Sequence, residues 1–177
     1  QDNFAPPEII NSARRLTDSA FSWRLGASYK FTPDTMLYAS ASRGFKSGGF
    51  DIGFLSAIPE EVELQLRPVL AETVTAYEVG LKSSLLDRRL TFDISAFYND
   101  YRNQQVFSLV PPPTGGITPV ATLDNARKAH TQGIDAQISV RPVPQLTLTA
   151  NLGLLKARLD EFVSSRDPSQ PDHSGNR

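Results

Sequence analysis

The strongest constraint on the fold of this chain is a strict alternation of apolar and polar side chains. Residues 21–31 read FSWRLGASYKF, in which every second residue, from Phe21 through Trp23 to Phe31, is apolar and the residues between are small or charged. An extended segment of this kind has one apolar and one polar face, because successive side chains of a strand point to opposite sides. Two neighbours suit the apolar face: the core of a soluble β-sandwich, or the lipid around a transmembrane β-barrel.

The alternation recurs along the chain and predicts an antiparallel all-β fold. Further strands are expected at about 36–46, 73–85, 89–101, 120–141 and 146–159, with the fourth strand continuing toward Val110. Short turns at about 32–35, 86–89 and 142–145 alternate with long segments at 1–19, 47–72, 100–120 and 160–177, which we predict to be loops. In an up-and-down sheet this order places all short turns at one end, as in outer-membrane barrels.

The placement of aromatic and charged residues also favours a membrane. The ten residues from Phe21 to Phe31 span roughly 33 Å, which projects to about 25 Å at the strand tilt of a barrel, the height of its apolar band. Aromatic residues lie near both ends of this segment. The charged residues of the strands fall on the polar face: Arg24, Lys30, Glu78, Lys82, Asp93, Asp135 and Arg141. A soluble sheet also keeps charges off its apolar face, so that alternative stays open. Arg43, which shares a face with Leu37, departs from the pattern.

The composition excludes several classes of function. Lys and Arg number 18 against 19 Asp and Glu, so no strong positive field predicts a nucleic-acid partner. The chain has no cysteine, which excludes disulfides, thiolate metal sites and cysteine nucleophiles. No run approaches the roughly 18 apolar residues of a spanning helix.

No motif in the sequence predicts catalysis, a cofactor or a metal site. The only two histidines, His130 and His173, lie far apart, and we expect each to be solvated or hydrogen-bonded rather than a metal ligand. Asp124, Asp135 and Ser139 could join His130 in a hydrolytic set, but no GxSxG motif supports it. We therefore expect no enzyme, and neither SGG at 47–49 nor TGG at 114–116 has the context of a phosphate loop.

The carboxylates have simpler expected roles. Those on the polar face, Glu78, Asp93 and Asp135, are expected to form salt bridges with Lys82, Arg24 or Arg141 on neighbouring strands. Glu60, Glu61 and Glu63 are expected to keep the segment 47–72 solvated.

Three stretches resemble the barrel of TonB-dependent outer-membrane receptors. They are YASASRGFKSGGF (38–50), AETVTAYEVGLKSSLLDRRLTFDISAFYNDYRNQQV (71–106) and LDNARKAHTQGIDAQISVRPVPQLTLTANLGLL (123–155). Within them, YEVGLK (77–82) resembles the YExGxK strand of that family, RGFKSGGF resembles a strand-to-loop junction, and Gly133 and Asp135 match a G(V/I)E/D-type strand.

The resemblance implies an up-and-down transmembrane barrel of about 22 strands in the Gram-negative outer membrane, closed by an N-terminal plug. Such receptors import ferric siderophores, vitamin B12 or glycans with energy relayed by the TonB complex. Residues 1–177 would then be an internal part of the barrel with about six strands, lacking the plug domain and the C-terminal strands. The implied partners are outer-membrane lipid, the TonB complex through the missing plug, and a small-molecule ligand, which we expect to be a ferric siderophore or similar chelate. Two alternatives are a porin-like barrel and a soluble all-β binding module.

Overall fold

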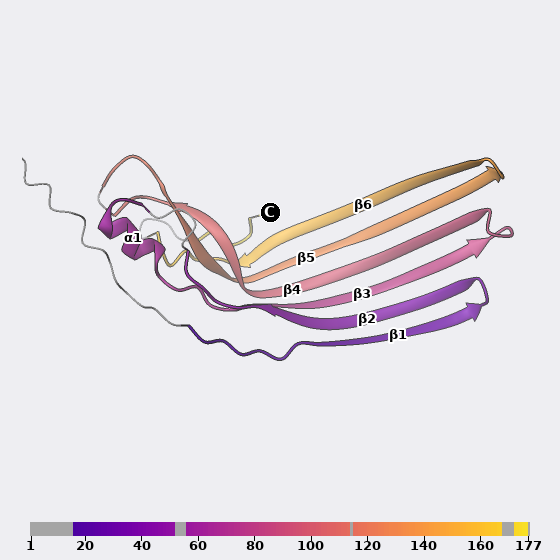
Figure 1. The fold of residues 1–177 in the computed structure, drawn as a ribbon, viewed down its shortest axis with the longest axis horizontal. Coiled ribbons are helices and arrows are strands. Elements are labelled where there is room, and N and C mark those ends of the chain that lie inside the picture. Colours follow the sequence, from indigo (N-terminus) through magenta and orange to yellow (C-terminus); the bar gives the residue numbers. More distant parts are fainter. Residues whose placement is uncertain (1–15, 52–55, 114, 168–171, 177) are drawn as a thin grey trace, which may run out of the picture.

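The computed structural model describes residues 16–51, 56–113, 115–167 and 172–176, and these form one antiparallel sheet of six strands in chain order (Figure 1). The strands are β1 (Trp23–Thr32), β2 (Thr35–Lys46), β3 (Glu72–Leu85), β4 (Leu90–Val110), β5 (Val120–Val143) and β6 (Leu146–Glu161). The predicted fold class is confirmed, and each predicted strand is present.

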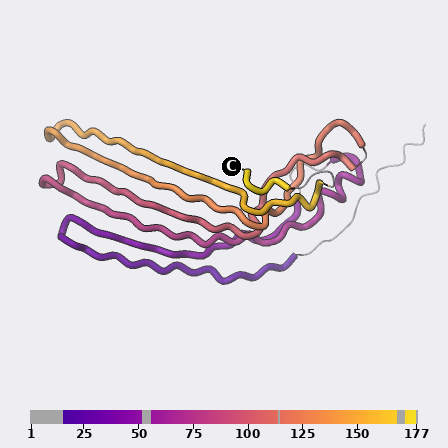
Figure 2. Tube along the Cα trace, turned by 180° about the vertical axis from the view of Figure 1, so that it is seen from behind, coloured from indigo at the N-terminus to yellow at the C-terminus, as the bar shows by residue number. Residues whose placement is uncertain are grey.

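The connections are sorted by length between the two ends of the sheet. The turns that join β1 to β2, β3 to β4 and β5 to β6 all lie at one end, and the longer connections gather at the other (Figures 1 and 2). The turn between β3 and β4 holds three successive residues in the left-handed conformation, Leu86, Asp87 and Arg88, at φ of 56°, 53° and 64°. We refer to the two ends as the turn end and the loop end.

One face of the sheet is a continuous apolar surface on which no other part of the described chain packs. The strand register aligns Ala27, Ala39, Val79, Ala96, Ile134 and Leu154 in one row across the sheet. The neighbouring row is Tyr29, Leu37, Leu81, Ile94, Ala136 and Leu152. Leu152 and Leu154 are 59% and 56% exposed. An exposed apolar surface that crosses six strands exceeds what a soluble monomer tolerates and fits contact with lipid.

The apolar surface slants across these rows by the amount that a tilted strand requires. Gly26, at the centre of the apolar run of β1, lies in the same row as Leu155, whereas the apolar run of β6 is centred near Ala150. This offset of about five residues is about 17 Å along the strand, over about 24 Å of sheet width. The resulting angle of about 35° is within the range of strand tilts of outer-membrane barrels, so one level apolar band crosses all six strands.

The slant also accounts for Arg43. Its row contains Trp23 on β1 and Thr75 on β3, and it lies one row beyond Tyr77 toward the loop end. Arg43 is therefore at the margin of the apolar surface, where an arginine reaches water, and its departure from the alternation does not place a charge in the middle of the membrane.

The segment between β2 and β3 contains a short helix, so the prediction of a loop throughout 47–72 was wrong here. Helix α1 (Pro59–Gln65) begins with proline, whose fixed φ suits a first helical turn, and Glu60 and Glu61 lie in that turn. Leu64 packs with Val110 and Val120, at the ends of β4 and β5. Glu61 is buried rather than solvated, and its carboxylate accepts a hydrogen bond of 2.6 Å from the Ser56 hydroxyl.

Residues 172–176 run antiparallel along the loop end of β6, within a tail that we predicted to be loop. The His173 amide donates to the Phe162 carbonyl at 2.7 Å, and the Gly175 amide donates to the Leu159 carbonyl at 2.6 Å. The Leu159 amide donates in turn to the Asn176 carbonyl at 2.9 Å. The up-and-down pairing therefore continues past β6.

Candidate functional site

The polar face of the sheet carries interacting side chains from β2, β3 and β4. Lys82 forms an ion pair of 2.5 Å with Asp93, and its ammonium lies 5.5 Å from the centre of the Tyr38 ring. The Tyr38 hydroxyl donates to Glu78 at 2.7 Å. The expected ion pair is confirmed for Asp93, whereas Glu78 bonds to a tyrosine instead of a cation. Arg24, Lys30, Glu78, Lys82, Asp93 and Asp135 all lie in register rows of this face, and Arg141, at the register shift between β5 and β6, bonds to Thr147.

Two glycines on the polar face lie beneath aromatic rings. A Cβ built on Gly80 would overlap the Tyr38 ring, and one built on Gly133 would lie 2.6 Å from the Phe97 ring and overlap the Leu154 carbonyl oxygen. Each ring therefore lies flat along the sheet only because its neighbour has no side chain. The resemblance to the YExGxK strand acquires a physical basis here, since Gly80 is its glycine.

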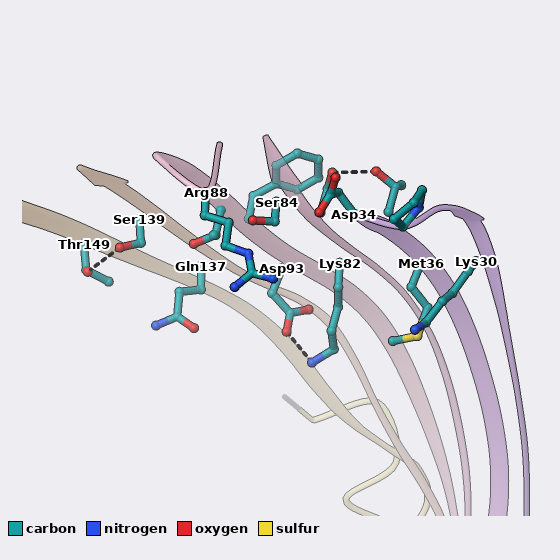
Figure 3. A pocket seen from close by; sticks show the side chains of 15 residues that line it. Lys30, Asp34, Met36, Lys82, Ser84, Arg88, Asp93, Gln137, Ser139 and Thr149 are labelled. Atoms are coloured by element: carbon teal, nitrogen blue, oxygen red, sulfur yellow. Dashed lines mark hydrogen bonds and ion pairs between the residues drawn. The ribbon is translucent and has the colours of Figure 1, made fainter. Parts of the chain in front are cut away.

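A hollow of about 500 Å³ opens on the polar face near the turn end (Figure 3). Its labelled side chains come from β1 to β6 and their turns, and they are mostly charged or hydroxylated: Lys30, Asp34, Met36, Lys82, Ser84, Arg88, Asp93, Gln137, Ser139 and Thr149. Ser139 and Thr149 are joined by a hydrogen bond of 3.1 Å, and Lys82 points toward Asp93. Such a surface suits water or a polar protein surface rather than an apolar ligand.

The loop end is a packed cluster made of three segments distant in sequence. We call it the outer loop cluster and define it as α1 with residues 66–71, the loop-end parts of β4 and β5, and residues 162–167. The Gln65 amide group donates to the Ala121 carbonyl at 3.0 Å and accepts from the Ser56 amide at 2.9 Å. The bond to Ala121 fixes α1 against the β4–β5 ribbon, and the bond from Ser56 fixes α1 to the segment before it.

Arg166 joins the segment after β6 to the end of α1. Its side chain is 5% exposed, and its guanidinium donates to the carbonyls of Leu64 at 2.6 Å and Arg67 at 2.9 Å. The last carbonyl groups of a helix have no hydrogen-bond donors within the helix, and here the Arg166 guanidinium is the donor. Burial lowers the pKa of Arg166, although nearby Asp124 opposes that effect.

Asp124 joins the same segment to β5. Its carboxylate accepts hydrogen bonds from the Ser164 hydroxyl at 2.9 Å and from the Ser165 hydroxyl and amide at 2.8 and 2.9 Å. The side chain is 3% exposed, so its charge is stabilised by these donors rather than by water. Because Arg166 follows directly, Asp124 also positions the residue that caps α1.

Two amide side chains attach the chain before β3 to the ribbon. Asn125 accepts from the Leu70 amide at 2.8 Å and donates to the Asn103 carbonyl at 2.7 Å. Gln105 donates to the Ser47 carbonyl at 2.9 Å and to the Leu70 carbonyl at 3.2 Å. Asn103 itself has a φ of 52° and directly follows Arg102, the last residue of β4 that pairs with β3. Beyond the end of β3, the β4–β5 ribbon curves away from the rest of the sheet (Figure 1).

A second hollow, of about 520 Å³, lies within the outer loop cluster. It is bounded by Leu64 and Arg67 beside α1, by the prolines at 111–113, and by residues 164–167. Its lining combines three prolines with the polar residues Ser164, Ser165 and Arg166. The cluster therefore presents a preformed mixed surface at the loop end.

The structure does not assemble the candidate hydrolytic set among the residues it describes. Ser139 and Asp135 lie on the polar face, whereas His130 lies in a row of the opposite face and Asp124 is in the outer loop cluster. His130 is hydrogen-bonded, as expected: its Nδ1 lies 2.7 Å from Asp160, a partner that only the fold reveals, and its ring stacks on Tyr98. The ring of His173 packs against Phe162.

The described part of the chain holds neither a metal-binding cluster nor a membrane-spanning helix. No three His, Asp or Glu side chains there are grouped so as to hold a metal ion. No helix in that part is long and apolar enough to cross a membrane.

A comparison with protein families matches the whole chain, residues 1–177, to the TonB-dependent receptor-like β-barrel model. The chain belongs to this family of TonB-dependent receptor barrels. The apolar surface therefore faces lipid, and this TonB-dependent receptor segment lies in the outer membrane of a Gram-negative cell.

The relatives of this receptor segment are transport receptors rather than enzymes. It is 32% identical over 169 residues to the metal-pseudopaline receptor CntO of Pseudomonas aeruginosa strain PAO1. The matched region covers 93% of this chain and 21% of CntO. The chain thus spans about a fifth of the length of the curated relatives it matches.

Solved structures agree on the fold of this TonB-dependent receptor segment. The siderophore receptor PirA from Pseudomonas aeruginosa matches with a TM-score of 0.60 and 22% identity, over 80% of this chain and 29% of that one. The ferric yersiniabactin uptake receptor FyuA from Yersinia pestis matches with a TM-score of 0.57 and 22% identity, over 76% and 18%.

Proposed function

We propose that this chain is part of an outer-membrane active transporter that imports a scarce nutrient, a ferric siderophore or similar metal chelate. The observation that carries the proposal is membership of the TonB-dependent receptor family along the whole chain. The ligand class is inferred from CntO, whose name describes a receptor for a metal complex of pseudopaline.

In this proposal the parts of the segment have separate roles. The outer loop cluster, with its hollow beside Arg166, contributes to ligand capture at the loop end. The polar face lines the lumen and contacts a plug domain outside this chain, through which the TonB complex acts. Further strands, also outside this chain, close the barrel to a total of about 22.

Uptake by the complete receptor tests the proposal. The receptor is expressed in a Gram-negative host that lacks its own receptors for metal chelates, and uptake of radiolabelled metal–pseudopaline and a panel of ferric siderophores is measured. At least one chelate is expected to accumulate against its gradient, and a protonophore or loss of TonB is expected to abolish accumulation. Uptake that only equilibrates and does not depend on TonB would instead indicate a porin-like barrel. Failure of every metal chelate, with TonB-dependent uptake of vitamin B12 or a glycan, would refute the ligand class alone.

A further inference from the structure

Basic side chains occupy the lipid-facing side of β5 and β6 directly beyond the apolar surface. Lys156 and Arg158 follow Leu154 at alternate positions of β6, and the register places them beside Gln132 and His130 on β5. Lys128 lies two residues beyond His130 toward the loop end, on the same side of β5. We call Lys128, Lys156 and Arg158 the basic rim.

The basic rim lies at the height of lipid headgroups. Lys156 and Arg158 are two and four residues beyond Leu154, which is about 7 and 13 Å along the strand. At a strand tilt of about 35°, these distances become about 5 and 11 Å of height above Leu154. The Tyr98 ring lies at the same boundary on β4, where interfacial aromatic residues are enriched.

The carboxylates near the basic rim are already engaged. Asp100 pairs with Arg102 at 3.1 Å, and Asp160 is hydrogen-bonded to His130 Nδ1 at 2.7 Å, a contact that is an ion pair only when the histidine is protonated. Glu161, which faces Lys128 in the register, pairs instead with Arg127 at 2.7 Å. Within the part of the chain that the structure describes, the three rim cations have no carboxylate within 4 Å. The rim is therefore a local surplus of positive charge in a chain whose total charge is −1.

We propose that the basic rim binds the phosphate groups of a phosphorylated lipid in the outer leaflet of the outer membrane. The rim lies on the side that lipid covers, at headgroup height, and its surplus charge complements a phosphate. Lys156 and Arg158 are i and i+2 neighbours on one strand, so their side chains project about 7 Å apart and can both reach one headgroup. Arginine and lysine are the residues that bind phosphate oxygens most strongly. This inference is independent of the imported ligand.

The test uses the purified complete receptor in detergent and lipid A carrying two phosphates, with native mass spectrometry to count bound lipid. The double variant K156Q/R158Q is compared with R24Q/K30Q, which removes two cations from the polar face of β1 instead. We expect K156Q/R158Q to lower the affinity for the lipid at least tenfold and R24Q/K30Q to leave it unchanged. Lipid A without phosphates is expected to bind weakly and equally to all three proteins.

Two controls keep the result decisive. Circular dichroism and heat-dependent gel mobility check that each variant is folded. If the double variant is not folded, the milder single variants K156Q and R158Q are measured in its place. Equal lipid affinity of the wild type and the folded rim variants would overturn the proposal, as would equally strong binding of phosphate-free lipid. Co-purification of a protein that the rim variants lose would assign the surface to a protein partner and would also overturn it.

Discussion

Replacing Arg166 by methionine should release α1 from the outer loop cluster without unfolding the membrane sheet. The substitution keeps an unbranched side chain but removes the two short hydrogen bonds to Leu64 and Arg67. A bond from a charged donor contributes about 1.5–3 kcal/mol, and part of this is recovered when water reaches the carbonyls. We therefore expect the free energy of local opening to fall by about 3 kcal/mol. This corresponds to an opening equilibrium that is on the order of 100-fold larger.

Hydrogen exchange of the complete receptor in lipid measures this opening. Amides at the end of α1, such as that of Leu66 directly after it, which donates to the Val62 carbonyl at 2.8 Å, should exchange on the order of 100-fold faster in R166M. Amides in the membrane part of β3 and β4 should not change. R67M is the matched control, because Arg67 is exposed and adjacent to the same helix end. Unchanged protection of α1 in R166M, or an equal loss of protection in the membrane strands, would refute the reasoning.

Three further predictions concern single positions. Ala96→Arg places a charge in the middle of the lipid-facing surface and should destabilise the receptor in vesicles by about 2–4 kcal/mol, whereas Ser95→Arg on the polar face should cost less than about 1 kcal/mol, as measured by urea unfolding. The Cβ added by Gly133→Ala meets the Leu154 backbone and should lower the free energy of unfolding by about 2 kcal/mol or more. The Cβ added by Gly80→Ala meets only a movable ring and should lower it by about 1 kcal/mol, so equal losses of stability would contradict the packing described. Hydrogen bonds from Ser174 lower the pKa of Asp172. Their stabilising effect is therefore present above the ordinary pKa and is lost as the pH falls through the folded value; an NMR titration should show a depressed midpoint that Ser174→Ala raises.

The membrane part of the fold was predictable because its environment acts on every second residue. Lipid on one side and water or polar protein on the other separate Leu81 from Lys82 and Ile94 from Asp93, and this separation is visible without any structure. The sorting of short and long connections added the direction of the strands. Arg43 departs from the alternation because it lies at the margin of the apolar surface, and the position of that margin along the strand cannot be determined from the sequence.

The outer loop cluster was not predictable, since its contacts join residues that are far apart in sequence. Arg166 caps a helix about a hundred residues earlier, and Asp124 bonds to Ser164 and Ser165 some forty residues later. Arginine, aspartate and serine are common loop residues, and nothing next to them in the sequence indicates burial. The only local signal was PEEVELQ, in which a proline followed by two acids is typical of a helix start.

The register between strands separated by long loops is set by the membrane as much as by contacts. A tight turn fixes β1 to β2, whereas 25 residues, from 47 to 71, join β2 to β3. Within them the Gly49–Val69 bridge continues the same ladder. A slip of one residue would turn Glu78 and Lys82 toward lipid, because it exchanges the two faces of the strand. A slip of two would restore the faces but move β3 by about 7 Å along its length, out of the level of its neighbours, and would remove Gly80 from beneath Tyr38. Lipid therefore excludes the odd registers outright, and the depth of the apolar band together with the glycine under the ring selects among the even ones.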